Sequence, residues 1–245
     1  MAYSNFAYYY DDLNQAADYN ALFCQVLAAL RAQGIHNGIV ADLGCGTGEM
    51  SIMLAAAGYD MIAIDASEDM LMVAREKAEE AGRGNILFLQ QNLAELDLYG
   101  TIRAAVATFD TVNHLPPVAL AAAVQKIALF MEAGGVFVFD ANTPYKHCEI
   151  LGNNAFTVET EDGLCCHWQN KYLPEIPATE ISVCVSDAGE TVCTERFLEY
   201  SYTLQELEEI LVQNKFKIKT ITDGENFGPV ANTSQRILIT AVKMG

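Results

Sequence analysis

Positive charge is scarce in this sequence: 14 lysine and arginine residues stand against 32 aspartate and glutamate residues, a formal net charge of −18 at pH 7. So acidic a chain repels the phosphate backbone of nucleic acids and the anionic surface of membranes. The sequence also lacks any stretch of the roughly 18–20 apolar residues that crossing a bilayer requires. We therefore expect neither nucleic acid nor a membrane as a partner.

The cysteines lack any Cys-x-x-Cys spacing, and their number, seven, is odd. This pattern favours free thiols in a reducing compartment over a disulfide framework. The segment Met1–Asp12 lacks the basic and apolar stretches of a signal peptide, so we expect a cytoplasmic protein. Cys165 and Cys166 would point to opposite faces of a strand and could not easily share an ion, so we predict no metal site.

Apolar residues, in contrast, are abundant. They make up 51% of the chain, against 19% for charged residues, which is enough to build a sizeable core. From Ile39 to Asp140, short apolar runs alternate with helical patterns in five βα units, which predicts a parallel sheet with helices on both faces. The expected strands are Ile39–Leu43, Tyr59–Asp65, Ile86–Gln90, Ala104–Phe109 and Gly134–Asp140.

The alternation then stops, because residues 157–202 show no helical period. Thr179–Ser186 and Thr191–Glu199 flank the glycine-containing turn Asp187–Gly189, which predicts an antiparallel hairpin. Cys165–Tyr172 is expected to add another strand to it.

Regular α/β patterning returns near the end of the chain. A capping box formed by Thr203 and Glu206 starts a helix, and Lys215–Asp223 and Arg236–Val242 are expected as the last two strands. With the five earlier strands they predict a seven-stranded, mostly parallel sheet with an antiparallel β insertion between the fifth strand and the following helix. The chain is thus divided into one α/β domain, residues 1–150 and 200–245, and the insertion, residues 151–199.

The strongest local signal is the run Asp42-Leu-Gly44-Cys-Gly46-Thr-Gly48, at the end of the first expected strand. Glycines let the backbone turn sharply and approach a ligand with no Cβ in the way. A dinucleotide fingerprint needs its third glycine at position 49, where this chain has Glu49. A glutamate there competes with a pyrophosphate for the helix dipole, so the run favours an amino acid carrying an adenosine over a diphosphate.

This run resembles the first motif of the class I S-adenosylmethionine-dependent methyltransferases, acid-x-Gly-x-Gly-x-Gly, and the resemblance covers essentially the whole chain. It implies a Rossmann-like fold and S-adenosylmethionine as cofactor, with the backbone of Gly44, Cys45 and Gly46 around the methionine part. Asp42 would fix the loop by accepting its amides, or would bind the cofactor ammonium through water.

The run after the second strand also matches that family. Asp65 ends the strand, where a carboxylate can accept both ribose hydroxyls, and Ala66 follows it. Met70 would pack on the adenine face. The resemblance further implies that Tyr10, Tyr19 and Phe109 line the cofactor.

The segment after the third strand departs from the family, which has Gln-Asp-Met where this chain has Gln91-Asn92-Leu93. Asn92 can still accept from the adenine amino group through its side-chain oxygen. The Leu93 backbone amide can serve the ring nitrogen. All three residues are therefore expected at the adenine end of the cofactor.

Four further runs resemble a group of small bacterial methyltransferases, similar to the sugar N-methyltransferases of antibiotic pathways. In those relatives the β insertion supports dimerisation and roofs the acceptor site, so we expect residues 151–199 to form a lid or dimerisation subdomain, compatible with a homodimer. Phe197–Tyr202 departs from the group's His-x-Gln-Arg-x-Tyr, so the sequence leaves open an acceptor that differs from those of these relatives. The matching runs are Thr108–Leu115, Phe139–Lys146, Trp168–Asn170 and Ser234–Ile237.

The resemblance implies an enzyme that transfers a methyl group to a small-molecule acceptor by in-line displacement. His114 is the candidate base, with Asp110 and Asn113 as candidate positioning residues. The alternative for His114 is that it begins and caps a helix. Tyr8, Tyr10 and Trp168 are expected as walls of the acceptor site.

Two other functions stay open at this stage. A non-catalytic protein that binds S-adenosylmethionine for regulation would explain the departures at Asn92 and near Phe197. A nicotinamide-dependent oxidoreductase is opposed by the glycine spacing. The sequence does not distinguish nitrogen, oxygen and carbon as the methylated atom.

Overall fold

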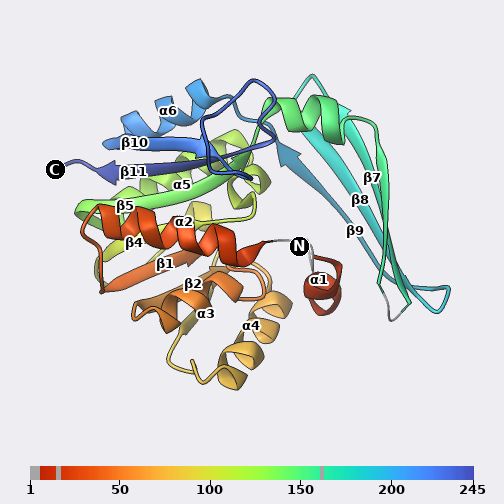
Figure 1. The fold of residues 1–245 in the computed structure, drawn as a ribbon, viewed down its shortest axis with the longest axis horizontal. Helices are drawn as coiled ribbons and strands as arrows, with labels where there is room; N and C mark the ends of the chain where they lie inside the picture. Colours follow the sequence, from red (N-terminus) through yellow and green to blue (C-terminus); the bar gives the residue numbers. More distant parts are fainter. Residues whose placement is uncertain (1–5, 15–17, 161–162) are drawn as a thin grey trace.

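The computed structural model describes residues 6–14, 18–160 and 163–245 and contains two sheets (Figure 1). The larger sheet has seven strands in the order β10-β11-β5-β4-β1-β2-β3, and the smaller has four, in the order β6-β7-β8-β9. The five strands β1 to β5 run parallel to one another, while β11 is antiparallel to both of its neighbours. The seven-stranded, mostly parallel sheet expected from the sequence is thus confirmed.

The strands of the larger sheet follow the expected apolar runs closely. They are β1 (Ile39–Leu43), β2 (Asp60–Asp65), β3 (Leu87–Gln90), β4 (Ile102–Ala107), β5 (Met131–Asn142), β10 (Phe216–Asp223) and β11 (Arg236–Lys243). In the described part of the chain, six α-helices and three short helical turns accompany them: α1 (Ala7–Leu13), α2 (Tyr19–Ala32), α3 (Glu49–Ala56), α4 (Glu68–Glu80), η1 (Leu93–Glu95), η2 (Thr111–His114), α5 (Pro117–Phe130), η3 (Lys146–Leu151) and α6 (Leu204–Gln213).

Helices cover both faces of the larger sheet. Val40, Val106 and Val138 pack in the cluster that includes α2, α3 and α4, whereas the adjacent residues Ala41, Ala107 and Phe139 pack in the cluster that includes α5 and α6. This division follows from the alternation of side chains along a strand, since both faces of a parallel sheet must be buried.

The segments that follow β3 and β5 are less regular than the sequence predicts. Between β3 and β4, the described residues form only the short turn η1, and β5 leads into the insertion rather than into a helix. The pattern of five consecutive βα units is therefore wrong in detail. The Asn92 side chain accepts the Ala94 amide and so caps the start of this turn.

The smaller sheet, which we call the wing, comprises β6 (Ala155–Glu159), β7 (Leu164–Leu173), β8 (Ala178–Asp187) and β9 (Glu190–Tyr200). It projects from the larger sheet, and β9 returns the chain to it (Figure 1). The expected hairpin joins β8 to β9 through Ala188 and Gly189, both at positive φ, as the tight turn between twisted strands requires. The strand β6 was not anticipated.

Helix α1 lies between the larger sheet and the wing (Figure 1). Phe6 and Leu13 pack into the apolar cluster on the inner face of the wing, with Ile181 and Val183. Among the described residues, no helix is long and apolar enough to span a membrane.

Candidate active site

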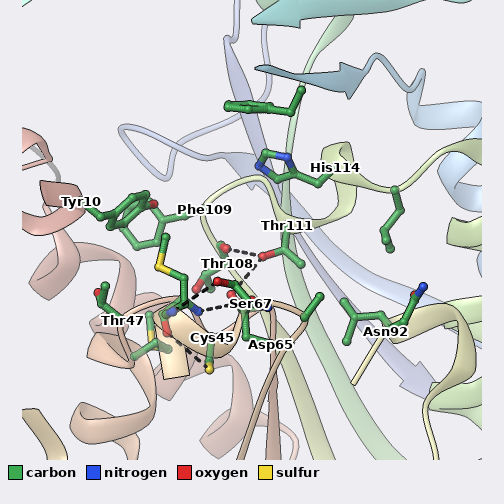
Figure 2. A pocket seen from close by; sticks show the side chains of 18 of the residues that line it. Tyr10, Cys45, Thr47, Asp65, Ser67, Asn92, Thr108, Phe109, Thr111 and His114 are labelled. Carbon is green, nitrogen blue, oxygen red and sulfur yellow. Dashed lines mark hydrogen bonds between the residues drawn. The ribbon is translucent and has the colours of Figure 1, made fainter. Parts of the chain in front are cut away.

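The carboxyl ends of β1, β2 and β4 border a cavity of about 590 Å³ that also contacts α1 and β9 (Figure 2). Ligands of open α/β sheets bind at this edge. The residues that line it include Tyr10, Tyr19, Gly44, Cys45, Gly46, Thr47, Asp65, Ala66, Ser67, Met70, Asn92, Leu93, Thr108, Phe109, Thr111, His114, Phe197 and Tyr200.

The loop after β1 approaches the cavity with its backbone. Gly44, Gly46 and Gly48 all have positive φ, which side-chain-bearing residues rarely adopt. A Cβ on Gly44 would lie 2.5 Å from the Thr111 side chain, whereas a Cβ on Gly46 would have no described atom within 4 Å. Gly44 is therefore needed for packing, and Gly46 leaves open space beside the backbone.

Asp65, at the end of β2, faces the same loop. Its carboxylate accepts from the Gly46 amide at 2.9 Å and from the Ser67 amide at 2.8 Å. Burial raises the pKa of this carboxyl, and the two amide hydrogen bonds oppose that shift. Each oxygen retains a second lone pair, so the carboxylate can accept further hydrogen bonds from a ligand.

Asp42 differs from its expected place. It is fully buried, and its Oδ2 accepts from the Ser51 hydroxyl of α3 at 2.6 Å rather than from a loop amide. Burial raises its pKa to about 7. Asp42 is not among the described residues that line the cavity, so it anchors helix α3 instead of contacting a ligand directly.

The expected adenine end of the cavity is only partly as predicted. Ala66, Met70, Asn92 and Leu93 line it. Gln91 does not, because its side-chain amide is paired with the backbone of Asp97 at 2.9 Å in both directions. That pairing makes Gln91 a brace of the turn, and we correct its assignment to the cofactor.

The end of β4 holds two consecutive residues, Phe109 and Asp110, at φ 55°. Such left-handed conformations are strained for residues with side chains and persist only where the surroundings hold them. The buried Asp140 carboxylate does so by accepting the amides of Phe109 at 3.0 Å and Asp110 at 2.6 Å. Arg236 lies 3.5 Å from Asp140 and compensates its charge.

Aromatic rings close the cavity on the side of α1. The ring centroids of Phe109 and Tyr19 lie 4.3 Å apart. The Arg236 guanidinium lies over the Phe109 ring, 5.6 Å from its centroid. Burial raises the pKa of Tyr19 to about 12, which keeps its hydroxyl protonated. Tyr10 also lines the cavity, whereas Tyr8 is exposed and contributes no wall.

Helix α1 is tied to the glycine loop by polar contacts. Asp11 accepts from the Thr47 hydroxyl at 2.7 Å and pairs with Lys77 of α4 at 2.6 Å. Lys77 also lies 3.1 Å from Glu49. These contacts keep Tyr10, the preceding residue, at the cavity.

The three candidate catalytic residues separate in the structure. His114 lines the cavity, with its ring 5.3 Å from that of Phe197 (Figure 2). Asn113 is fully buried, donates to the carbonyls of Asn142 and Tyr200, and accepts the Asn142 amide at 2.8 Å. Asn113 therefore joins β5 to β9, and we correct its assignment as a positioning residue.

Asp110 faces a second cavity of about 230 Å³, which we call the inner compartment. It lies between the wing and the ends of β4 and β5, and Trp168 lines it instead of the first cavity. Its lining residues are Asp110, Asn142, Lys146, Leu151, Phe156, Trp168, Asn170, Ile181 and Glu199.

Asn142 is the centre of the polar groups there. It donates to Asp110 at 2.7 Å and to Glu199 at 3.3 Å, and it accepts from Lys146 at 2.9 Å. Burial raises the pKa of Glu199 to about 7, and the nearby Asp110 charge acts in the same direction.

Sequence reasoning assigned no role to Asp140, Asn142, Lys146, Glu199 or Arg236. Four of them belong to the runs Phe139–Lys146 and Ser234–Ile237, which resemble the family but do not show a role for the single residues. The signal was thus present in the sequence, but it did not show that these runs meet at one place.

Comparisons with known proteins agree with this geometry. A family model described as a methyltransferase domain matches residues 40–135. A protein of Geobacillus sp. (strain WCH70), provisionally named a methyltransferase, is 28% identical over 99% of this chain and 100% of its own length. The magnesium-protoporphyrin O-methyltransferase of Synechocystis sp. is 32% identical, over 54% of this chain and 69% of its own.

Solved structures share the fold. An S-adenosylmethionine-dependent methyltransferase from Clostridium acetobutylicum aligns with a TM-score of 0.86 and 24% identity, over 99% of both chains. The sugar N-methyltransferase KedS8 from Streptoalloteichus aligns with a TM-score of 0.79 and 18% identity, over 100% of this chain and 94% of its own. The Rossmann-like class expected from the sequence is confirmed.

Proposed function

This chain belongs to the S-adenosylmethionine-dependent methyltransferase family, and from that premise we propose that it methylates a small-molecule acceptor. The observation that carries the proposal is the cavity in which the Gly46 backbone and the Asp65 carboxylate lie side by side. S-adenosylmethionine supplies a methyl group already activated on a sulfonium and leaves as S-adenosylhomocysteine.

The residues present fit that group. The cavity of about 590 Å³ lies within the usual range of roughly 300–1,000 Å³ for small-ligand sites. The open space beside Gly46 admits a ligand against the backbone, and Asp65 offers oxygens for the ribose hydroxyls. Met70 and Leu93 provide apolar surface for a purine.

The protein's own tasks in this reaction are alignment and exclusion of water. Phe109, Tyr10 and Tyr19 shield the cavity from solvent on the side of α1. His114 is the proposed base for an acceptor that arrives protonated, because its imidazole lines the cavity beyond the Asp65 end.

Several observations support a small acceptor. The wing and α1 enclose the site, so we propose that residues 151–199 act as a lid, and an extended polymer would have to displace them. The net charge of −18 opposes nucleic acid as a substrate. KedS8, which shares the fold, is named a sugar N-methyltransferase. We further propose that the chain forms a homodimer and is cytoplasmic.

The proposed function is tested by screening for methylated products. The full chain is incubated with S-adenosylmethionine and with sets of amine, hydroxyl and carboxylate metabolites, and products are identified by mass spectrometry. We expect an increase of one methyl group in one class of acceptor. S-adenosylhomocysteine binding without any product would instead favour a regulatory protein.

A further inference from the structure

The amino edge of the parallel strands borders a further cavity of about 700 Å³, which we call the basic pocket. It lies where β5 begins and β11 ends, near the C-terminus and at the edge opposite to the first cavity (Figure 1). Its walls come from the ends of α5 and α6 and from the last residues of the chain. None of the residues already assigned to the first cavity or the inner compartment belongs to it.

Three lysines line the basic pocket: Lys126 of α5, Lys215 after α6 and Lys243 of β11. They are three of only 14 basic residues in a chain of net charge −18. No aspartate or glutamate is among the described lining residues, and none of the three lysines forms an ion pair with another described residue. Burial and the nearby charge of Lys215 lower the pKa of Lys243. The pocket thus gathers positive charge that the protein itself leaves uncompensated.

The neighbouring helix ends do not account for these lysines. Lysines near a helix C-terminus often bind its last carbonyls. The last turn of α6, however, already accepts from the amides of Asn214 and Lys215 and from the Asn214 side chain. At the end of α5, the Ala128 carbonyl accepts from the Lys243 ammonium. Within the part of the chain that the structure describes, the ammonium groups of Lys126 and Lys215 make no hydrogen bond, so both are available to a ligand.

Lys215 occupies a backbone position that glycine would fill more easily. It directly follows Asn214, the C-cap of α6, and its φ is 63°. Helices commonly place glycine at this position, because a Cβ is unfavourable in the left-handed conformation. Lysine at a strained position therefore keeps a positive charge at the pocket at some cost in stability, as is typical of functional sites.

We propose that the basic pocket binds the phosphate group of a small phosphomonoester, held by the ammonium groups of Lys126, Lys215 and Lys243. Such a group carries about −1.5 to −2 charges at neutral pH, and lysine binds phosphate as a point charge. A single carboxylate would leave two of the three positive charges uncompensated. Leu129 and Met244, whose side chains are exposed, would contact the organic part of the ligand. This site is separate from the first cavity and does not depend on methyl transfer.

Phenyl phosphate and phenol are suitable probes, because they share a ring and differ in the charged group. The full chain, with excess S-adenosylhomocysteine to fill the first cavity, is titrated calorimetrically with each probe at about 0.15 M salt. We expect one site for phenyl phosphate per chain and an affinity about tenfold or more lower for phenol. Equal affinities, or no binding of phenyl phosphate, would overturn the proposal.

Variants locate the binding. Lys126→Gln and Lys215→Gln should each weaken phenyl phosphate binding about tenfold. Lys215→Gly should lose the same affinity without lowering the urea midpoint of unfolding, because glycine suits the positive φ. Lys219→Gln is the matched control: this exposed lysine of β10 is outside the described lining and removes the same charge. An equal loss in Lys219→Gln, or unchanged affinity in both Lys126→Gln and Lys215→Gln, would overturn the proposal.

Phosphatidic acid presents the same group on a membrane surface, so a second experiment separates the two sources. We expect no cosedimentation with vesicles of phosphatidic acid and phosphatidylcholine, because the chain is strongly acidic overall. Cosedimentation without binding of free phenyl phosphate would contradict a small-molecule site.

The affinity for S-adenosylhomocysteine should be the same in all four variants and in the unchanged protein, since the first cavity lies at the other edge of the sheet. Failure of S-adenosylhomocysteine to bind at all would refute the proposed function. The phenyl phosphate titrations would still decide the basic pocket.

Discussion

The backbone amide of Gly46 donates a 2.9 Å hydrogen bond to the carboxylate of Asp65, joining the loop after β1 to the end of β2. Neither residue alone makes a binding surface. Together they place an exposed backbone next to a carboxylate at the carboxyl edge of a parallel sheet, where ligands bind.

Alanine at two glycines of this loop should have different effects. Gly44→Ala places a Cβ 2.5 Å from Thr111 and should destabilise the fold by about 2 kcal/mol or more. Gly46→Ala meets no described atom within 4 Å, so it should cost only about 1 kcal/mol but weaken S-adenosylhomocysteine binding strongly. Denaturant unfolding and calorimetry measure the two effects.

Gly34→Ala is the control for backbone strain. Gly34 also has positive φ, with no described atom within 4 Å of a Cβ, and it is remote from the cavity. It should lose about 1 kcal/mol of stability and keep full ligand affinity. Equal affinity losses at Gly34 and Gly46 would contradict the role of Gly46.

His114→Ala tests the proposed base. Once an acceptor has been found, the variant should lower kcat by about 100-fold, the usual contribution of general base catalysis at its lower end. S-adenosylhomocysteine affinity should stay within about twofold, because the proposed contacts of His114 are with the acceptor. Unchanged turnover would end its candidacy as the base.

Glu199→Gln should change how stability depends on pH. Burial raises the pKa of Glu199 from 4.5 to about 7, so the native state retains a proton that the unfolded state releases. The unfolding free energy of the unchanged protein therefore falls as pH rises from about 4.5 to 7, relative to the variant. Between pH 4 and pH 8, the unfolding free energy of the variant minus that of the unchanged protein should rise by on the order of 3 kcal/mol.

Urea unfolding at pH 4, 6 and 8 measures that difference. Glutamine keeps an oxygen that can accept from the Asn142 amide, so the variant can still form the hydrogen bond that Glu199 accepts at 3.3 Å. A difference between variant and unchanged protein that stays flat from pH 4 to 8 would show that Glu199 titrates normally.

Asp11→Ala tests the attachment of α1. Loss of the contacts with Thr47 and Lys77 should weaken S-adenosylhomocysteine binding about two- to fivefold, because Tyr10 is then held less firmly at the cavity. Asp12→Ala removes an exposed carboxylate from the same helix and should have no effect. Calorimetry should distinguish them, and equal affinities would mean that the ion pair does not support the site.

The sheet was predictable from the sequence because each strand carries its own signal. Ile39–Leu43 and Phe137–Phe139 are apolar runs, buried on both faces, that are typical of parallel strands. The turn at η1 was not predictable in the same way, because its three residues are too few to show a helical period.

The site was predictable where one local segment forms it and not where distant segments meet. The glycine loop and Asp65 were found from short motifs. The surroundings of Asp140 required knowledge of how β4, β5 and β11 pair, because Asp140 and Arg236 are far apart in sequence. Asn113 failed as a candidate for the same reason: its partners, Asn142 and Tyr200, come from other strands.

The most direct test of the account is calorimetric titration of the unchanged protein and of Asp65→Ala with S-adenosylhomocysteine and with NADH. We predict one S-adenosylhomocysteine site per chain, an affinity loss of about 100-fold in Asp65→Ala, and no binding of NADH. Asp97→Ala, an exposed carboxylate outside the cavity, should bind as the unchanged protein does. Binding of NADH alone, or an unchanged affinity in Asp65→Ala, would contradict the proposed site.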